Sequence, residues 1–400
     1  MSFRPWLLST FTVPFLAASA HAADWYRWRG PDLNGVSRET GWQAKWPDNG
    51  PNQLWKASLG AGCSSISVSQ GRAYTMGNIE GGFDVVYCFD AATGKLVWRH
   101  SYLCDLNPKN FEGGPAATPA VDGNRVYTFS RKGDLLCLDA AYGRIIWAKN
   151  VTQDPGCQSP TWGFSGSVLV EGSLVILNAG PAGIAFDKST GKLAWSSGKG
   201  RPAYSTPVAF DNGNQRAVAI FGANALQIVN PADGKSLWSF PWKTEYDLNA
   251  ADPVISSNKL FLSSGYGRGC ALIDAHSQPN VYWENKNLHA RFNNAVLWNG
   301  YLYSADESGK LKCVSWDTGD IKWSDKTFGE GSVLIAGGKI IGLSERGELM
   351  VADATPAGFK PISRAQVLGG KCWTLPVLAN GRIYCRNTRG DLVCLDVRNP

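Results

Sequence analysis

The sequence predicts an all-β fold, an eight-bladed β-propeller of four-stranded antiparallel blades. Two observations carry this prediction. A segment of about eleven residues, most copies ending in tryptophan, recurs along the chain, and an alternating apolar segment broken by glycine turns precedes each copy. The copies are spaced by roughly 40 to 49 residues, which is the spacing of propeller blades rather than of helical solenoids.

The composition also favours short strands and tight turns. Charged residues make up only 18% of the 400 residues, whereas glycine occurs 45 times and tryptophan 17 times. This balance is typical of β-rich chains rather than of long solvated helices. The net charge is +6 without a basic block, so we expect no nucleic-acid partner.

Residues 1–22 are predicted to be a secretory signal peptide. They combine a positively charged start, a short apolar stretch and a small-residue cleavage motif at residues 20–22. The apolar stretch is too short to span a membrane, and no cysteine near the cleavage point offers a lipid anchor. We therefore expect a periplasmic or secreted protein without a membrane span, with a leader at 23–49 and the propeller at 50–400.

The first copy of the recurring segment is CFDAATGKLVW, from Cys88 to Trp98. Five later copies are CLDAAYGRIIW ending at Trp147, AFDKSTGKLAW at Trp195, IVNPADGKSLW at Trp238, LIDAHSQPNVYW at Trp283 and CVSWDTGDIKW at Trp323. A seventh version, VADATPAGFKPI, has lost its tryptophan. Each copy with the alternating segment before it is predicted to form one blade.

The last blade is predicted to close the ring with an N-terminal strand. An eighth copy begins as CLDV at Cys394, and three strands of that unit are present before the sequence ends. The segment QLWKASL, from Gln53 to Leu59, carries Trp55 and has no blade of its own. We expect it to pair with residues 391–397, because closure removes an exposed sheet edge.

Within Cys88–Trp98 the residues have structural tasks. The Asp90 carboxylate and Thr93 can accept backbone N–H groups of the turn, and Gly94 supplies a positive φ. Trp98 can bury roughly 150–250 Å² between neighbouring blades. The predicted docking residues are Trp55, Trp98, Trp147, Trp195, Trp238, Trp283 and Trp323.

The pattern Ala-x-Asp-x-x-Thr-Gly-x-x-x-Trp resembles the tryptophan-docking motif of the PQQ-like, or quinoprotein dehydrogenase-like, propeller family. Non-catalytic relatives with this motif include the lipoprotein of the outer-membrane β-barrel assembly machinery, whose lipid-attachment motif we do not find. The resemblance covers about residues 50–400, and WRGPDLNG at 28–35 is similar to the leader of exported bacterial members. It implies two alternatives, a binding scaffold or an enzyme with pyrroloquinoline quinone (PQQ) and calcium.

We expect the non-catalytic alternative. The resemblance implies that a PQQ enzyme would show adjacent cysteines and calcium ligands beside a catalytic aspartate, and none can be matched here position by position. His100, His276 and His289 are scattered, without HExxH or paired spacing, and GxSxG and GxxxxGK[ST] are absent. We therefore predict no catalytic or metal-binding residue, no cofactor, and a scaffold for binding or protein interaction in the cell envelope. The alternative is a PQQ-dependent alcohol or sugar dehydrogenase; a carbohydrate-acting enzyme has no carboxylate pair to support it.

The loops that precede the inner strands should gather on one face of the propeller and form an axial funnel. The candidate residues there are Glu112, Trp162, Arg201, Tyr204, Asp252, Arg291 and Trp373. They form either a solvated rim or a pocket in which Arg201 and Arg291 bind an anionic group and Trp162 and Trp373 stack. We expect a monomer with protein or peptide partners, or with a small ligand in the funnel.

Ten cysteines in an exported chain raise the question of disulfides. Equivalent positions in different blades, such as Cys88, Cys137 and Cys313, should lie too far apart and act as small buried residues. Three other pairs are candidates, with free thiols as the alternative for each: Cys385 with Cys394, Cys63 with Cys372, and Cys104 with Cys157.

Overall fold

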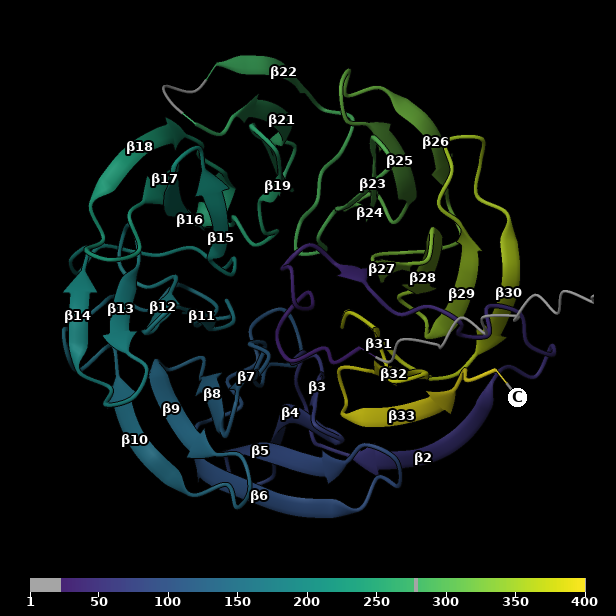
Figure 1. Ribbon diagram of the computed structural model, residues 1–400, viewed down its shortest axis with the longest axis horizontal. Coiled ribbons are helices and arrows are strands. Elements are labelled where there is room, and N and C mark those ends of the chain that lie inside the picture. Colours follow the sequence, from purple (N-terminus) through teal and green to yellow (C-terminus); the bar gives the residue numbers. More distant parts are fainter. Residues whose placement is uncertain (1–22, 277–279, 400) are drawn as a thin grey trace, which may run out of the picture.

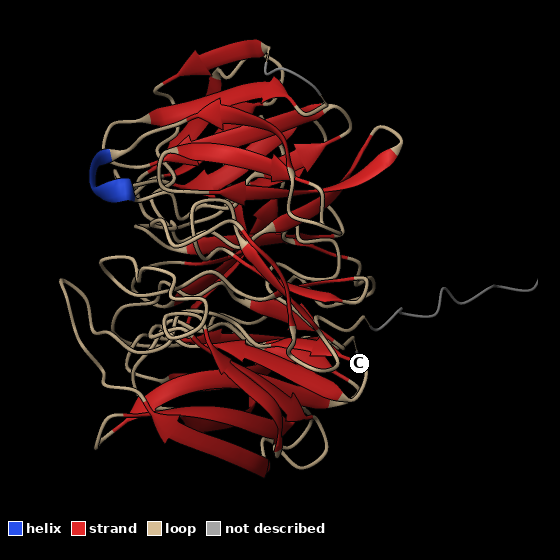
Figure 2. Cartoon of the chain, turned by 90° about the vertical axis from the view of Figure 1, so that its left-hand side faces the viewer, coloured by secondary structure: helices blue, strands red, loops and turns tan. Residues whose placement is uncertain are grey.

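The computed structural model describes residues 23–276 and 280–399, so the predicted signal peptide lies outside the described residues. Eight antiparallel sheets surround a central axis, which confirms the eight-bladed propeller (Figure 1). Among the described residues the one helical element is the 3-10 turn η1 (Glu245–Asp247), and no helix is long and apolar enough to cross a membrane. Figure 2 shows η1 on one face and the C terminus on the other.

The strands follow one another from the axis outward in each blade. In chain order they are β3 (Ser67–Ser69), β4 (Arg72–Ile79), β5 (Phe83–Asp90) and β6 (Leu96–Leu103) in blade 1; β7 (Ala120–Asp122), β8 (Arg125–Phe129), β9 (Asp134–Asp139) and β10 (Ile145–Asn150) in blade 2; β11 (Leu169–Glu171), β12 (Leu174–Leu177), β13 (Ile184–Asp187) and β14 (Leu193–Ser196) in blade 3; β15 (Val208–Asn212), β16 (Gln215–Phe221), β17 (Ala225–Val229) and β18 (Ser236–Pro241) in blade 4. The second half contains β19 (Val254–Ser256), β20 (Lys259–Ser264), β21 (Gly269–Asp274) and β22 (Val281–Asn285) in blade 5; β23 (Val296–Trp298), β24 (Tyr301–Ala305), β25 (Leu311–Ser315) and β26 (Ile321–Asp325) in blade 6; β27 (Ser332–Ala336), β28 (Lys339–Leu343), β29 (Glu348–Asp353) and β30 (Pro361–Gln366) in blade 7; β31 (Val377–Ala379), β32 (Arg382–Arg386) and β33 (Asp391–Asp396) in blade 8.

The ring closes as predicted. Strand β2 (Asn52–Ser58) pairs antiparallel with β33, and Trp55 lies opposite Cys394 in that register (Figure 1). Every blade therefore has four antiparallel strands, and no blade is left open at the junction of the two ends of the propeller.

The turn of Cys88–Trp98 has the predicted geometry and one further constraint. Asp90 Oδ1 accepts the N–H groups of Ala92 and Thr93, and Gly94 has φ +70°. A Cβ on Gly94 would also lie 2.5 Å from the ring of Trp55 in blade 8. Glycine is thus required twice, for the turn and for the close approach of the preceding blade's tryptophan.

Docking tryptophans join each blade to the next. Trp98 is 8% exposed, and its Nε1 donates a 2.9 Å hydrogen bond to the carbonyl oxygen of Ala140 in blade 2. The same bond to the following blade is made by Trp55, Trp147, Trp195, Trp283 and Trp323. Trp238 packs between blades 4 and 5, and the turn that follows it in blade 5 includes residues 277–279, which are outside the described residues.

Cysteine replaces alanine in four blades, each with a tyrosine beside it. Cys88 on β5 lies between Tyr74 on β4 and Trp98 on β6, and the two rings are 6.0 Å apart. Blades 2, 6 and 8 repeat this arrangement with Cys137, Cys313 and Cys394 opposite Tyr127, Tyr303 and Tyr384. A small thiol fits where two large rings meet, so these cysteines are packing residues.

The three candidate disulfides are absent, because all ten cysteines, which lie within the described residues, are free. For Cys385 and Cys394 the reason is register. Cys385 lies opposite Val393, so Cys394 is one residue further along β33 and its side chain points to the other face of the sheet. Cys104 and Cys157 are both buried as free thiols, and Cys157 Sγ contacts the carbonyl oxygen of Gly198 at 3.8 Å. Cys63 and Cys372 likewise remain separate thiols.

The leader runs around the axis on the face opposite η1. Trp25 exchanges two backbone hydrogen bonds with Val68 of β3, and β1 (Val36–Ser37) pairs in parallel with β27. Further along, the Glu39 carboxylate accepts the N–H groups of Asn380 and Gly381 at the β31–β32 turn. The leader therefore crosses one end of the axis (Figure 1, purple).

Candidate functional site

A cavity of about 310 Å³ lies on the axis, on the face formed by the loops between blades. Aromatic side chains dominate its lining: Trp28, Phe111, Trp162, Phe164, Tyr204, Tyr266, Phe292 and Trp373. Charged groups in the lining are Lys109, Arg131, Asp252 and Arg291. Concave, largely aromatic sites with a few polar groups are typical of ligand-binding pockets.

The floor of the cavity is a ring of hydrogen bonds from blade to blade, which we call the girdle. A short polar residue lies two residues before the inner strand in blades 1 to 6, at its first position in blade 7 and three residues before it in blade 8. In blade order these are Ser65, Thr118, Ser167, Thr206, Asp252, Asn294, Ser332 and Thr374. From blade 1 to blade 5, the backbone N–H of each one donates to the side-chain oxygen of the next. Ser65 Oγ also donates to the carbonyl of Leu375 at 2.8 Å, which connects blade 1 to blade 8.

Asp252 is the only acidic member of the girdle, and it anchors the leader. Its Oδ1 accepts the N–H of Thr206 at 2.7 Å, and its Oδ2 accepts Nε1 of Trp28 at 2.7 Å. Arg29, which is also buried, lies 3.9 Å from the same oxygen. Burial raises the pKa of Asp252 to about 6, while Arg29 partly opposes this rise. A serine or threonine has one side-chain oxygen and no charge, whereas the carboxylate presents one oxygen to Thr206 and the other to Trp28 and Arg29 of the leader.

Two aromatic pairs stand at the mouth. Trp162 and Tyr204 precede the inner strands of blades 3 and 4, with ring centroids 6.0 Å apart. Phe292 and Trp373 meet on the other side at 4.7 Å. Tyr246 of η1 extends the first pair outward, since its ring contacts that of Trp162 edge-on. The mouth is therefore walled by rings from several separate loops.

Five of the seven predicted funnel residues line this cavity: Trp162, Tyr204, Asp252, Arg291 and Trp373. Glu112 and Arg201 are not in the lining; Glu112 pairs with Lys371 at 3.1 Å and Arg201 with Asp247 at 3.2 Å. Arg201 is not among the lining residues that include Arg291, so joint binding of an anionic group by these two arginines stays a prediction. Arg291 itself pairs with Glu330 at 2.5 Å.

Sequence reasoning missed several lining residues. Trp28 belongs to the leader, and only the folded chain brings its side chain under the funnel. Phe111 comes from the loop between blades 1 and 2 and Arg131 from the β8–β9 turn, and neither was among the predicted funnel residues. The girdle could have been found from sequence, since a polar residue lies at or shortly before the start of every inner strand.

The lining of the cavity is poor in the carboxylates that calcium beside a quinone would use. Hard cations bind six to eight oxygen ligands, several of them carboxylates. Within residues 23–276 and 280–399, no three Asp, Glu, His or Cys side chains converge on one point. Asp252, the one carboxylate in the lining, already has three partners.

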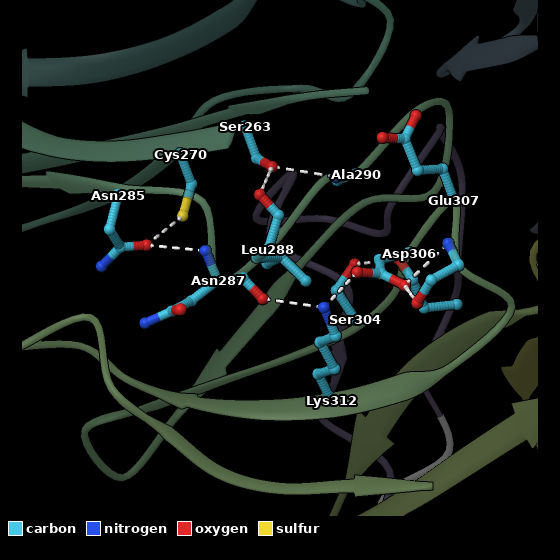
Figure 3. Close-up of polar contacts among 12 residues, drawn as sticks. Ser263, Cys270, Asn285, Asn287, Leu288, Ala290, Ser304, Asp306, Glu307 and Lys312 are labelled. Carbon is cyan, nitrogen blue, oxygen red and sulfur yellow. Dashed lines mark hydrogen bonds and ion pairs between the residues drawn. The ribbon is translucent and has the colours of Figure 1, made fainter. Parts of the chain in front are cut away.

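A second polar cluster lies in blades 5 and 6 and has a structural task. Lys312 and Asp306 form a buried ion pair, and Lys312 Nζ also donates to the Asn287 carbonyl at 2.9 Å (Figure 3). Asp306 Oδ1 accepts the N–H of Ser308, which closes the β24–β25 turn. The Lys312 ammonium is bonded to Asp306 and Asn287, and the Asp306 carboxylate also holds the turn, so we interpret this pair as structural.

The comparisons with known proteins agree with this architecture. The family model described as outer membrane protein assembly factor BamB matches residues 34–103 and 82–325. The chain belongs to this family. One member, from Moranella endobia (strain PCIT), is 26% identical over 298 residues, which is 70% of this chain and 74% of that protein.

Other relatives share the fold or a part of the sequence. The family's structure from Moraxella catarrhalis superposes with a TM-score of 0.66 at 17% identity, covering 87% of this chain and 98% of that one. The quinohemoprotein alcohol dehydrogenase ADH IIB of Pseudomonas putida is 32% identical over 123 residues, but these are 28% of this chain and 17% of the enzyme. The likeness to this family of assembly factors therefore extends over much more of the chain than the likeness to the dehydrogenase.

Proposed function

We propose that this chain is a non-catalytic scaffold of the cell envelope that binds protein partners through the face bearing the axial cavity. Membership of a family named for outer membrane protein assembly is the observation that carries the proposal. The cavity is consistent with it, because its rings and cations suit binding while its single carboxylate is occupied by the leader. We expect the mature protein in the periplasm, facing such partners.

A crosslinking experiment tests this function. Tyr246 at the cavity mouth and Tyr142 on a turn of the opposite face are exposed by 57% and 70% respectively. Each is replaced separately by the photocrosslinker p-benzoylphenylalanine in the full chain in living cells. We expect a crosslink to an outer-membrane assembly protein from position 246 only. Equal crosslinking from position 142, or none from position 246, would contradict the proposal.

A PQQ-dependent oxidoreductase is the second candidate, favoured by the partial similarity to a quinohemoprotein alcohol dehydrogenase. Titration of the purified protein with PQQ and Ca²⁺, followed by a dye-linked assay with alcohols and sugars, distinguishes the two. We expect neither a bound-quinone spectrum nor dye reduction. A stoichiometric quinone spectrum with dye reduction would establish the enzyme instead.

A further inference from the structure

We propose that the axial cavity selects an anionic group carried on an aromatic body, which in a protein partner is an acidic residue beside an aromatic one. This inference rests on the proposed function and specifies the partner's chemistry. Three observations support it: the distribution of charge around the cavity, the aromatic rings in its lining, and the leader residue Trp28 that is bonded to Asp252.

The cations on the blade 2 side of the cavity have no ion-pair partner among the described residues. Lys109 is exposed, and its Nζ donates only to the carbonyl of Thr161, at 3.1 Å. Arg131 is buried, and its guanidinium donates to the carbonyls of Leu106 and Trp162. Carbonyl oxygens orient a cation without neutralising it, so this side of the cavity keeps positive charge.

Three acids, Glu307, Glu330 and Glu345, lie in blades 6 and 7 and are engaged by the protein itself. Glu330 pairs with Arg291, and Glu345 Oε1 accepts Nε1 of Trp373 at 3.2 Å. Glu307 accepts the N–H groups of Tyr266 and Gly267. Their mutual repulsion contributes to a raised pKa at Glu330, for which burial is the largest cause. An anionic ligand is therefore repelled from blades 6 and 7 and drawn toward Lys109.

The aromatic body of the ligand is expected beside Trp162. The carbonyl bonded by Lys109 belongs to the residue before Trp162, and Arg131 lies 6.0 Å from the ring centroid of Phe111. A ring inserted between Trp162 and Phe111 would therefore place an attached anion near Lys109. Trp28 of the leader also lines the cavity and is bonded to Asp252 of the girdle, so we expect the ligand to enter from the mouth.

Two dyes of similar aromatic shape test this selection. 8-Anilinonaphthalene-1-sulfonate is anionic and N-phenyl-1-naphthylamine is neutral, and both fluoresce when bound to apolar sites. We expect the anionic dye to bind more tightly to the full chain, with an affinity that falls as salt rises. Lys109→Glu should lower the affinity for the anionic dye by about fivefold or more and leave the affinity for the neutral dye nearly unchanged. Trp162→Leu should weaken both.

Lys132→Gln is the matched control, because Lys132 is exposed next to Arg131 but pairs with Asp105 and does not line the cavity. It should change neither affinity. The peptide Ac-EFEFE-NH₂ should displace the anionic dye and Ac-KFKFK-NH₂ should not. Equal affinity for both dyes, no effect of Lys109→Glu, or equal displacement by both peptides would overturn the inference. Crosslinking from position 246 would still stand in that case, so the two proposals fail separately.

Discussion

The backbone N–H of Trp46 donates a 3.2 Å hydrogen bond to Oγ of Ser363, the residue of blade 7 that stands where the other seven blades have a docking tryptophan. Ser363 lies opposite Val351 just before a bulge, as Trp98 lies opposite Cys88 in blade 1. Trp46 is 8% exposed, like Trp98, and belongs to the buried cluster that blades 7 and 8 share. The leader thus places a buried aromatic residue beside the strand of blade 7 that has lost its tryptophan.

Trp46→Ala should therefore lower the free energy of unfolding by about 3–5 kcal/mol, the usual cost of removing a buried tryptophan. Denaturant unfolding measures this change. Ser363→Trp in the Trp46→Ala background should recover part of the loss, because it restores a tryptophan within the blade. Tyr142→Ala, at an exposed turn, is the control. If the double variant is no more stable than Trp46→Ala, Trp46 does not substitute for the docking residue.

Asp252 should make stability fall as pH rises through the acidic range. Its pKa is about 6 in the folded protein against 3.8 for the unperturbed group, so the folded state binds more protons between these values. The free energy of unfolding from this group alone should therefore decrease by up to about 3 kcal/mol from pH 4 to pH 7. Comparison of the wild type with Asp252→Asn over this range isolates the effect. Parallel curves for the two proteins would contradict it.

Arg386 holds blade 8 to blade 1 through main-chain oxygens. Its fully buried guanidinium donates to the carbonyls of Ser64 and Met76 at 2.8 and 2.6 Å. Arg386→Met should destabilise the protein by about 3 kcal/mol or more, since it leaves several buried carbonyls without donors. Arg389→Met, at a neighbouring exposed position, should change stability by less than about 0.5 kcal/mol. Similar thermal unfolding of both variants would be inconsistent with this role.

Thiol chemistry should distinguish Cys63 from the other nine cysteines. Cys63 lines the cavity and is partly exposed, whereas the others are buried. Burial raises the pKa of its thiol to about 11, so alkylation of the native protein should be slow at neutral pH and faster toward pH 10. Mass spectrometry of the alkylated native protein should find one modified cysteine, Cys63. In denaturant without reductant all ten should react; fewer would reveal a disulfide.

The repeats were sufficient to predict the blades, their order and the closure of the ring. Asp90, Gly94 and Trp98 act within a few residues of one another or at a fixed repeat spacing, so their roles follow from local backbone chemistry and periodicity. The aromatic and polar residues in the loops that lead to the inner strands were also identifiable, because the topology places those loops on one face. That is why Trp162, Tyr204 and Trp373 could be assigned to the funnel.

Only the tertiary structure decided what the non-repeating residues do. The leader reaches Asp252, Ser363 and the β31–β32 turn across more than 200 residues of sequence, and no local pattern encodes such contacts. The ion pairs of Glu112 with Lys371 and of Arg201 with Asp247 likewise join separate loops. The sequence by itself determined the ring of blades, since each blade repeats the same strand pattern, turn and packing residue within a short stretch of chain. The tertiary structure decided the site, since charge and burial there depend on loops that meet only at the axis.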